Sequence, residues 1–295
     1  MILDFGYLCM TFRLNLSDSF DFPCHIHAEK SRTYAGGHAT NQAIAAARSG
    51  AKVAMIGTIG TDVFGENITK TLRREGISTS GIAKSTTPTG VIHTLINHEH
   101  QKATVSSANA NLESVAEQLP YNMLNERALI LLQNDMATNI NIKILKRAKT
   151  RKARAIMCFP HDENIEDTLL DNLDIVIIDE KTLPAICEQL SIPLETYTQY
   201  FAKEKNVHCI ITRNNGQSGA YAISKNQEKY EQRSSPNDTP TSQADIFDSF
   251  CGTFTSCIQA GLNLPKAMLY AVSAASLTAE NDAFPYLGDI EDNLD

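Results

Sequence analysis

Residues 36 to 43 combine two glycines with polar side chains, in a spacing that suits a ligand-binding loop. The segment reads GGHATNQA, and an alanine-rich helical pattern follows it as far as Gly50. The glycine at position 37 lets the backbone pass close to a small ligand, and the Asn41 amide near the start of the helix can bind hydroxyl groups there. The sequence therefore predicts a site for a small molecule that carries hydroxyl groups.

Short apolar runs alternate with helical patterns along the rest of the chain. The apolar runs are 53–56, 128–132, 153–157, 175–178 and 207–211, and helical patterns occur at 62–74, 140–148, 181–189, 248–261, 265–279 and near Ile290. Strands that return through helices form a parallel sheet covered on both faces, so the predicted fold class is α/β. A dehydrogenase is disfavoured, because Gly57-x-x-Gly60 is not the Gly-x-Gly-x-x-Gly dinucleotide fingerprint.

Composition argues against nucleic acids and membranes as partners. The 295 residues carry a formal net charge of −8, so the chain is not expected to bind the phosphate backbone of a nucleic acid. No run approaches the roughly 20 apolar residues of a membrane span, and the first residues lack the basic segment of a signal peptide. The seven cysteines are scattered, which suits reduced thiols in a core, so we expect a cytoplasmic protein without membrane contact.

Motifs spread over nearly the whole chain resemble those of the ribokinase-like (PfkB) carbohydrate kinases. The glycine pair with Asn41 and Gly60 matches the family's first signature in order and spacing. Segments 57–65 and 212–219, and the run D-x-F-x-G-x-F that begins at Asp248, resemble three later motifs. The chain is therefore identified as a divergent member of this family.

The resemblance implies a fold, a reaction and an assembly. The implied fold is a single domain over residues 1–295, a three-layer sandwich with a mostly parallel central sheet and a small β lid from about residues 11–35 and 89–106. The implied reaction is ATP-dependent phosphorylation of a sugar or sugar-like hydroxyl compound, with Mg²⁺ held on ATP. A homodimer through the lid is the implied assembly.

The resemblance also assigns site residues. Asp248 is the implied catalytic base, placed at a helix N-terminus. The implied substrate-binding residues are Gly37, His38, Asn41, Asp135 and Thr11. The implied nucleotide-binding residues are Thr212, Gly216, Gly219, Asp245, Phe247 and Asn281, and the implied metal ligand is Asp179.

Several positions depart from the family's pattern. Active members read Gly-Ala-Gly-Asp before the catalytic helix, where the glycines expose backbone N–H groups to phosphate, whereas residues 245–248 read Asp-Ile-Phe-Asp. Thr182 replaces the Glu of an Asn-x-x-Glu motif, and Cys9 and Thr11 replace two sugar-binding side chains. His38 replaces a lysine of ribokinases. Ribose is therefore not the expected substrate, and a catalytically weak or inactive relative, acting as sensor or scaffold, is the alternative.

Overall fold

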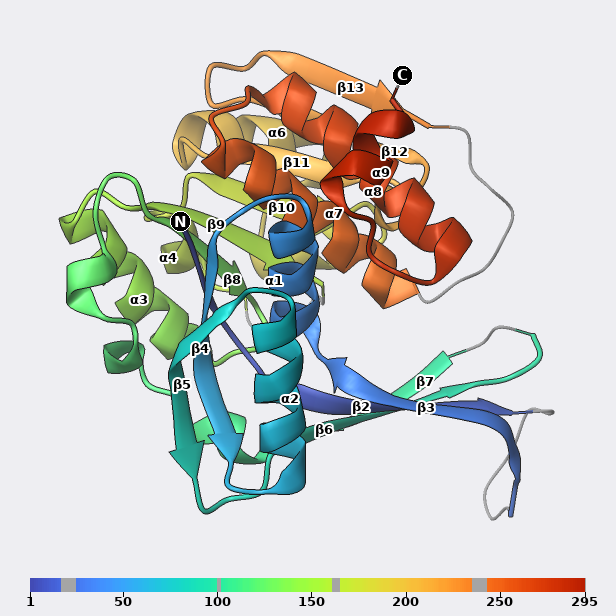
Figure 1. The fold of residues 1–295 in the computed structure, drawn as a ribbon. Helices are drawn as coiled ribbons and strands as arrows, with labels where there is room; N and C mark the ends of the chain where they lie inside the picture. Colours follow the sequence, from blue (N-terminus) through green and yellow to red (C-terminus); the bar gives the residue numbers. More distant parts are fainter. Residues whose placement is uncertain (17–24, 100–101, 161–164, 235–242, 295) are drawn as a thin grey trace.

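The computed structural model describes residues 1–16, 25–99, 102–160, 165–234 and 243–294 (Figure 1). Its centre is a nine-stranded sheet in the order β13-β12-β11-β10-β9-β8-β1-β4-β5, in which every pairing from β11 to β5 is parallel. Its strands are β1 (Ile2–Phe5), β4 (Val53–Gly60), β5 (Ser78–Ser85), β8 (Leu129–Gln133), β9 (Arg154–Phe159), β10 (Ile175–Asp179), β11 (His208–Thr212), β12 (Gly219–Ile223) and β13 (Lys229–Arg233). The predicted α/β class is confirmed.

Helices cover both faces of this sheet. Successive residues of a strand point to opposite sides, and apolar side chains on both sides need to be buried. In β1, Ile2 points into a core shared with α1 (His38–Arg48), α2 (Val63–Arg74), α7 (Gln243–Gln259) and α8 (Leu264–Asn281). Its neighbour Leu3 points into the opposite core, which is shared with α3 (Thr138–Thr150), α4 (Asp167–Leu170) and α5 (Leu183–Gln189). The short helices α6 (Tyr197–Gln199) and α9 (Leu287–Asp292) complete the α-helices of the described residues. Within these residues we find no helix with the length and apolar character needed to cross a membrane.

A second sheet of four strands projects from this body, and we call it the lid (Figure 1). Its order is β3-β2-β6-β7, and its strands are β2 (Cys9–Leu16), β3 (Ala28–Gly36), β6 (Gly90–Ile96) and β7 (Lys102–Ser107). The predicted lid segments fall here, except that residues 17–24 and 100–101 lie outside the described residues. Asp62 links α2 to the base of the lid. It caps α2 and accepts hydrogen bonds from the N–H (2.8 Å) and hydroxyl (2.6 Å) of Thr89, which directly precedes β6.

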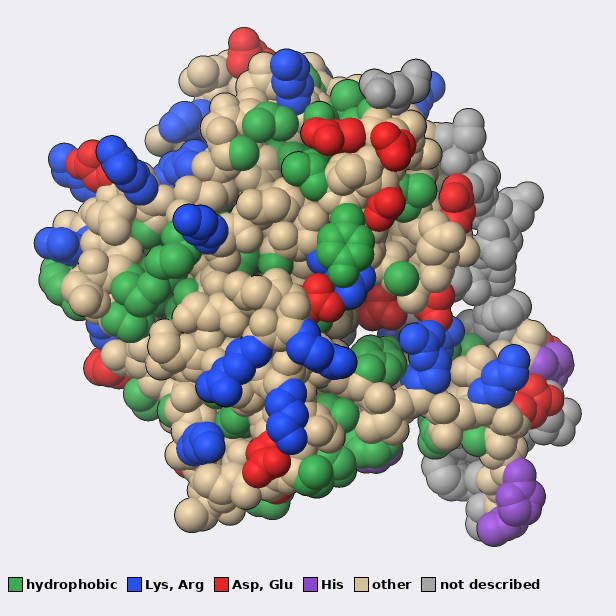
Figure 2. Space-filling model, viewed as in Figure 1, with side chains coloured by type: hydrophobic (Ala, Val, Ile, Leu, Met, Phe, Trp, Pro, Cys, Tyr) green, Lys and Arg blue, Asp and Glu red, His purple; other side chains and the backbone are tan. Residues whose placement is uncertain are grey.

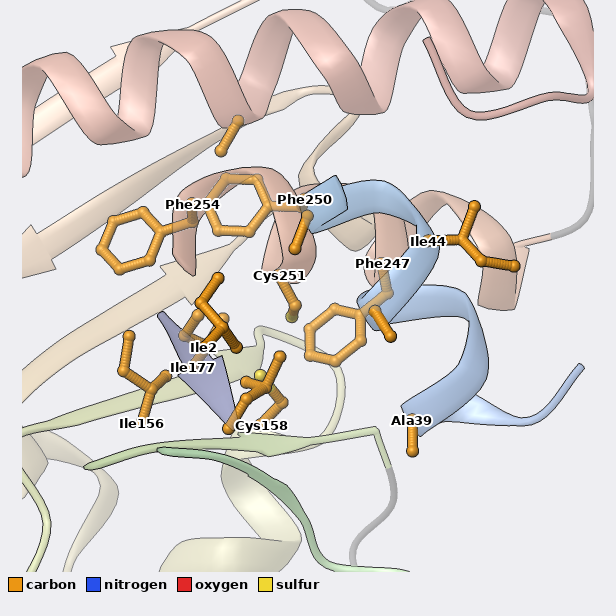
Figure 3. Close-up of a cluster of buried hydrophobic side chains, with 14 of the residues drawn as sticks. Ile2, Ala39, Ile44, Ile156, Cys158, Ile177, Phe247, Phe250, Cys251 and Phe254 are labelled. Atoms are coloured by element: carbon orange, nitrogen blue, oxygen red, sulfur yellow. The ribbon is translucent and has the colours of Figure 1, made fainter. Parts of the chain in front are cut away.

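Helix α7 begins five residues earlier than the sequence predicts. The prediction started this helix at Asp248, whereas α7 starts at Gln243, so Asp248 lies in the second turn and not at the helix N-terminus. No glycine interrupts residues 245–247, and Ile246 and Phe247 are only 3% and 2% exposed, so burial favours a helical continuation. Figure 3 shows Phe247 among other buried side chains of this core, which include Cys251.

A glycine of α7 permits close contact with α1. A Cβ at Gly252 would lie 2.4 Å from the carbonyl oxygen of Gln42 and 2.7 Å from the Cβ of Ala45. Any side chain at this position would therefore push the two helices apart. The close packing brings the polar first turns of α1, with Asn41 and Gln42, against Asp248.

Candidate active site

A cavity of about 590 Å³ lies between the lid and the carboxyl ends of the central strands. Strands β2, β6 and β7 form its wall on the lid side, and the first turns of α1 and α7 form its floor. In open α/β sheets, ligands bind outside the carboxyl ends of the strands. The predicted site residues that line this cavity are Thr11, Gly37, His38, Asn41, Asp135, Asp179, Asp245, Phe247 and Asp248.

Asp248 is fully buried at the floor, and three side chains of α1 hold its carboxylate. His38 Nδ1 donates to Oδ1 at 2.9 Å, and Gln42 Nε2 donates to the same oxygen at 2.8 Å. Asn41 Nδ2 donates to Oδ2 at 2.9 Å. All three donors come from the start of α1, where Gly37 has a φ of 88° that favours glycine. Helix α1 therefore fixes the orientation of the Asp248 carboxylate.

Neighbouring charges shift the pKa values of two other groups at the floor. Burial lowers the pKa of His38, but the charge and the hydrogen bond of Asp248 outweigh this effect, so the net pKa is raised above 6.5. Burial raises the pKa of Asp135 to about 6, with the charge of His38 opposing the shift and that of Asp248 adding to it. At the floor, Asp248 therefore favours the charged form of His38, whereas burial favours the neutral form of Asp135.

A chain of buried amides links Asp248 to a second carboxyl group. Gln133 Nε2 donates to Gln42 Oε1 at 3.0 Å and to Asp4 Oδ1 at 3.1 Å. Burial raises the pKa of Asp4 well above its ordinary value; the hydrogen bond from Gln133 opposes this, and the charges of Asp248 and Asp135 add to it. The buried site therefore favours a neutral Asp4. These hydrogen bonds also orient the Gln42 side chain. Its amide oxygen accepts from Gln133, so its amide nitrogen points to Asp248.

Carboxylates also line the other side of the cavity. Asp179, at the end of β10, accepts hydrogen bonds from the Thr212 hydroxyl (2.8 Å) and from the backbone N–H groups of Asn215 (2.7 Å) and Lys181 (3.1 Å). Asp179 therefore organises the turn that follows β11. Asp245, from the first turn of α7, accepts a hydrogen bond from Asn41 at 3.1 Å.

Four predicted nucleotide-binding residues do not line the cavity. Thr212 is buried beneath Asp179, and Gly216 packs against Phe250, whose ring a Cβ would approach to 2.8 Å. Gly219 begins β12, and Asn281 lies at the end of α8, where its side chain donates to the Leu277 carbonyl at 3.0 Å. Their part in nucleotide binding stays a prediction.

The structure adds residues that the sequence reasoning did not identify. Arg13, Tyr34 and Lys102 line the cavity from the lid. Strand alternation could have found Arg13, because it shares a face with Cys9 and Thr11. Tyr34 and Lys102 come from other strands, and only the strand pairing brings them to this face.

A family model described as pfkB family carbohydrate kinase matches residues 1–283. This chain belongs to the pfkB family of carbohydrate kinases. Ribokinase from Staphylococcus aureus (strain COL) is 26% identical over 267 residues, which cover 86% of this chain and 85% of that protein. The structure of Thermotoga maritima ribokinase matches with a TM-score of 0.87 at 21% identity, covering 99% of this chain and 98% of that one.

A second solved structure, Arabidopsis thaliana ribokinase complexed with ribose and ATP, matches with a TM-score of 0.85 at 20% identity. The match covers 99% of this chain and 98% of the Arabidopsis chain. These structural likenesses confirm the ribokinase-like fold, with its mostly parallel sheet and small lid.

The start of α7 differs from the glycine turn that the sequence resemblance led us to expect. Helix N–H groups beyond the first turn bond to carbonyls four residues earlier, so those of Phe247 and Asp248 are used within α7. The N–H groups left for a ligand are those of the first turn, which ends at Asp245. An acidic side chain there is stabilised by the helix dipole, but it also occupies the place where a helix N-terminus attracts anions.

Proposed function

We propose that this pfkB-family chain transfers a phosphoryl group from ATP to a hydroxyl group of a sugar or sugar-like compound. The observation that carries the proposal is the buried Asp248 carboxylate, which three donors of α1 hold at the floor of the cavity. The cavity volume of about 590 Å³ falls in the range of sites for small molecules.

In this proposal Asp248 is the base that receives the hydroxyl proton. The entering hydroxyl replaces one of the three donors to Asp248, and His38 is the donor that yields, because its side chain is 15% exposed whereas Gln42 is fully buried. Asn41 and Gln42 keep their hydrogen bonds and hold the carboxylate in line with the hydroxyl. Asp248 takes the proton as the hydroxyl oxygen attacks.

The side of the cavity that carries Asp179, at the end of β10, suits a magnesium ion that is bound together with ATP. The described residues contain no group of three or more His, Cys, Asp or Glu side chains that could hold a metal by themselves. Protein-bound Mg²⁺ is commonly held by one or two carboxylates together with phosphate oxygens and water. Asp179 is the residue that would hold it, and bound Mg²⁺–ATP supplies the phosphoryl group and offsets its charge.

The start of α7 favours a second candidate, a relative that binds a sugar or nucleotide but transfers phosphate slowly or not at all. Asp245 lines the cavity at a position where the resemblance implies a glycine. A carboxylate about 4 Å from the γ-phosphate would cost on the order of 4 kcal/mol at an effective dielectric constant of ~20. This cost corresponds to a loss of roughly a thousandfold in rate.

Calorimetry with Mg²⁺–ATP and a panel of sugars and nucleosides, followed by measurement of ADP formation, tests the two candidates. The kinase proposal expects ADP only when an acceptor that binds is present. Binding without ADP formation supports the second candidate.

The variant Asp245→Asn sharpens this test, with the exposed Asp292→Asn as the matched control. If Asp245 repels phosphate, the variant gains ATP affinity and turnover. A stable variant with lower turnover would instead show that Asp245 assists the transfer. Phe247 is left unchanged, because it packs in the core.

We also propose that two copies associate through the lid. Strand β7 lies at the edge of the lid sheet and all six of its residues are exposed, including Val105 at 64%. An edge strand presents backbone N–H and C=O groups that another chain can pair with. Light scattering should therefore give about twice the 32.4 kDa chain mass, and Val105→Lys should lower it. A wild-type mass of one chain would contradict this proposal.

A further inference from the structure

The lid face that looks into the cavity combines a guanidinium group with hydroxyl groups. Cys9, Thr11 and Arg13 of β2 all line the cavity, because side chains two residues apart in a strand share a face. The same face continues across the neighbouring strands, because Arg13 pairs with Thr94 of β6 and Thr94 pairs with Thr104 of β7. These groups are suited to an anion rather than to a neutral ring alone.

Lys102 adds a second cation from the start of β7. It lines the same cavity, and none of the salt bridges found among the described residues includes it. Burial lowers the pKa of Lys102, the charges of Asp245 and Asp248 oppose this shift, and the charge of Arg13 adds to it. Two cations close enough to interact across one cavity favour an anion between them.

Arg13 is anchored without being neutralised. It lies directly opposite Arg32 in the antiparallel pair of β2 and β3, where like charges destabilise each other. Asp282, which follows α8, accepts from both guanidinium groups, at 3.2 Å from Arg13 and 2.6 Å from Arg32. One carboxylate shared by two guanidinium groups leaves a net positive charge. Figure 2 shows acidic and basic side chains facing each other where the lid meets the body.

We infer that the acceptor substrate carries an anionic group, a carboxylate or a phosphate, which binds Arg13 and Lys102 beneath the lid while a hydroxyl of the same molecule reaches Asp248. The hydroxyl part of this inference rests on the proposed function, whereas the anion part rests on the lid alone. The resemblance to ribokinases places an aspartate at the position of Thr11, so this face lacks an expected acid and presents cations instead. A neutral sugar would leave Arg13 with only the carboxylate that it shares with Arg32.

Matched pairs of neutral and anionic compounds test the inference by calorimetry in the absence of ATP. The probes are ribose against ribonate and ribose 5-phosphate, and glucose against gluconate and glucose 6-phosphate. We expect an anionic member to bind at least about tenfold more tightly than its neutral partner, with a difference that shrinks as sodium chloride is added. The stronger of the carboxylate and phosphate members identifies the anion.

Variants then locate the binding. Lys102→Gln is the first choice, because Lys102 belongs to neither hydrophobic core of the described residues. It should reduce the difference between anionic and neutral members about tenfold. Lys84→Gln, an exposed change on β5, should leave the difference as in wild type. Arg13→Gln should act like Lys102→Gln, and a thermal melt checks that the variant remains folded.

Equal affinities within every pair would overturn the inference. It would also be overturned if Lys102→Gln weakened ATP binding and left the preference for anionic acceptors intact, because Lys102 would then serve the nucleotide. Binding of an anionic acceptor without ADP formation would uphold the inference and contradict the proposed function. Phosphorylation of neutral sugars alone would support the proposed function and contradict the inference of an anionic acceptor.

Discussion

The floor and the lid of the cavity differ in packing, because the floor is tightly packed and buried whereas the lid is exposed. At the floor, α1 packs closely against α7, and Asp248 is fully buried with donors already in place. The lid projects from the body, its β7 strand is exposed, and ion pairs of Arg13 and Arg32 with Asp282 hold it. The floor is therefore oriented without a ligand, whereas the lid presents the side chains of Arg13 and Lys102 to the cavity. On this contrast we propose that the floor carries the chemistry and that the lid selects the acceptor.

The largest effect is expected from Asp248→Asn at the floor. An amide cannot accept the hydroxyl proton, so turnover should fall at least ~100-fold while acceptor binding is nearly unchanged. Turnover is measured as ADP formation and binding by calorimetry, with Asp292→Asn as the control. A folded Asp248→Asn protein with wild-type turnover would remove Asp248 from the role of base.

Gly252→Ala tests whether close helix packing sustains the floor. The added Cβ meets the Gln42 carbonyl and Ala45, so we expect a loss of about 1–3 kcal/mol in unfolding free energy and lower turnover with every acceptor. Urea unfolding gives the first quantity. Gly288→Ala is the control, because a Cβ there meets nothing within 4 Å. Equal stability of the two variants would show that α1 and α7 can separate without cost.

The pH dependence of kcat/KM tests the pairing of His38 with Asp248. The pKa of His38 is raised, so the imidazolium persists above pH 6.5 and keeps its hydrogen bond to the Asp248 carboxylate, which the entering hydroxyl must displace. We therefore expect kcat/KM to fall as pH is lowered through this raised pKa, and His38→Gln to flatten that limb. The stability that the ion pair contributes has the opposite dependence, being present at low pH and lost as pH rises through the raised pKa. An identical profile in His38→Gln would contradict the pairing.

The smallest effect is expected from Arg32→Gln in the lid. Arg32 is 64% exposed, and exposed ion pairs contribute about 0–1 kcal/mol, so unfolding free energy should change little. Asp282→Asn should cost more, because Arg13 and Arg32 then face each other without an anion. Asparagine also tolerates the left-handed backbone of residue 282, where φ is 51°, so the comparison isolates charge. A larger loss in Arg32→Gln than in Asp282→Asn would contradict the shared anchor.

The sequence predicted the fold, and the loop that lines the cavity at Gly37, His38 and Asn41, better than the start of α7. Glycine spacing and hydrophobic runs are local signals, and they placed the parallel sheet and the loop with Gly37, His38 and Asn41. The start of α7 was predicted wrongly, because the resemblance implied a turn with glycines at positions 245 and 247, whereas Asp245 and Phe247 stand there and α7 continues through them. The approach of Lys102 to Arg13 depends on pairing among β2, β6 and β7, which no local pattern encodes.

The burial of Cys251 makes its thiol an internal probe for the opening of the protein at α7. Cys251 follows Asp248 by three residues, and burial, then the neighbouring Cys158, raises its pKa well above the ordinary value. A thiol reagent can reach this sulfur only when α7 separates from the sheet, so the rate of modification measures that opening. A ligand that bridges the lid and Asp248 should slow the reaction. Mass spectrometry at Cys251 would thus detect occupancy of the cavity before the phosphate donor or the acceptor has been identified.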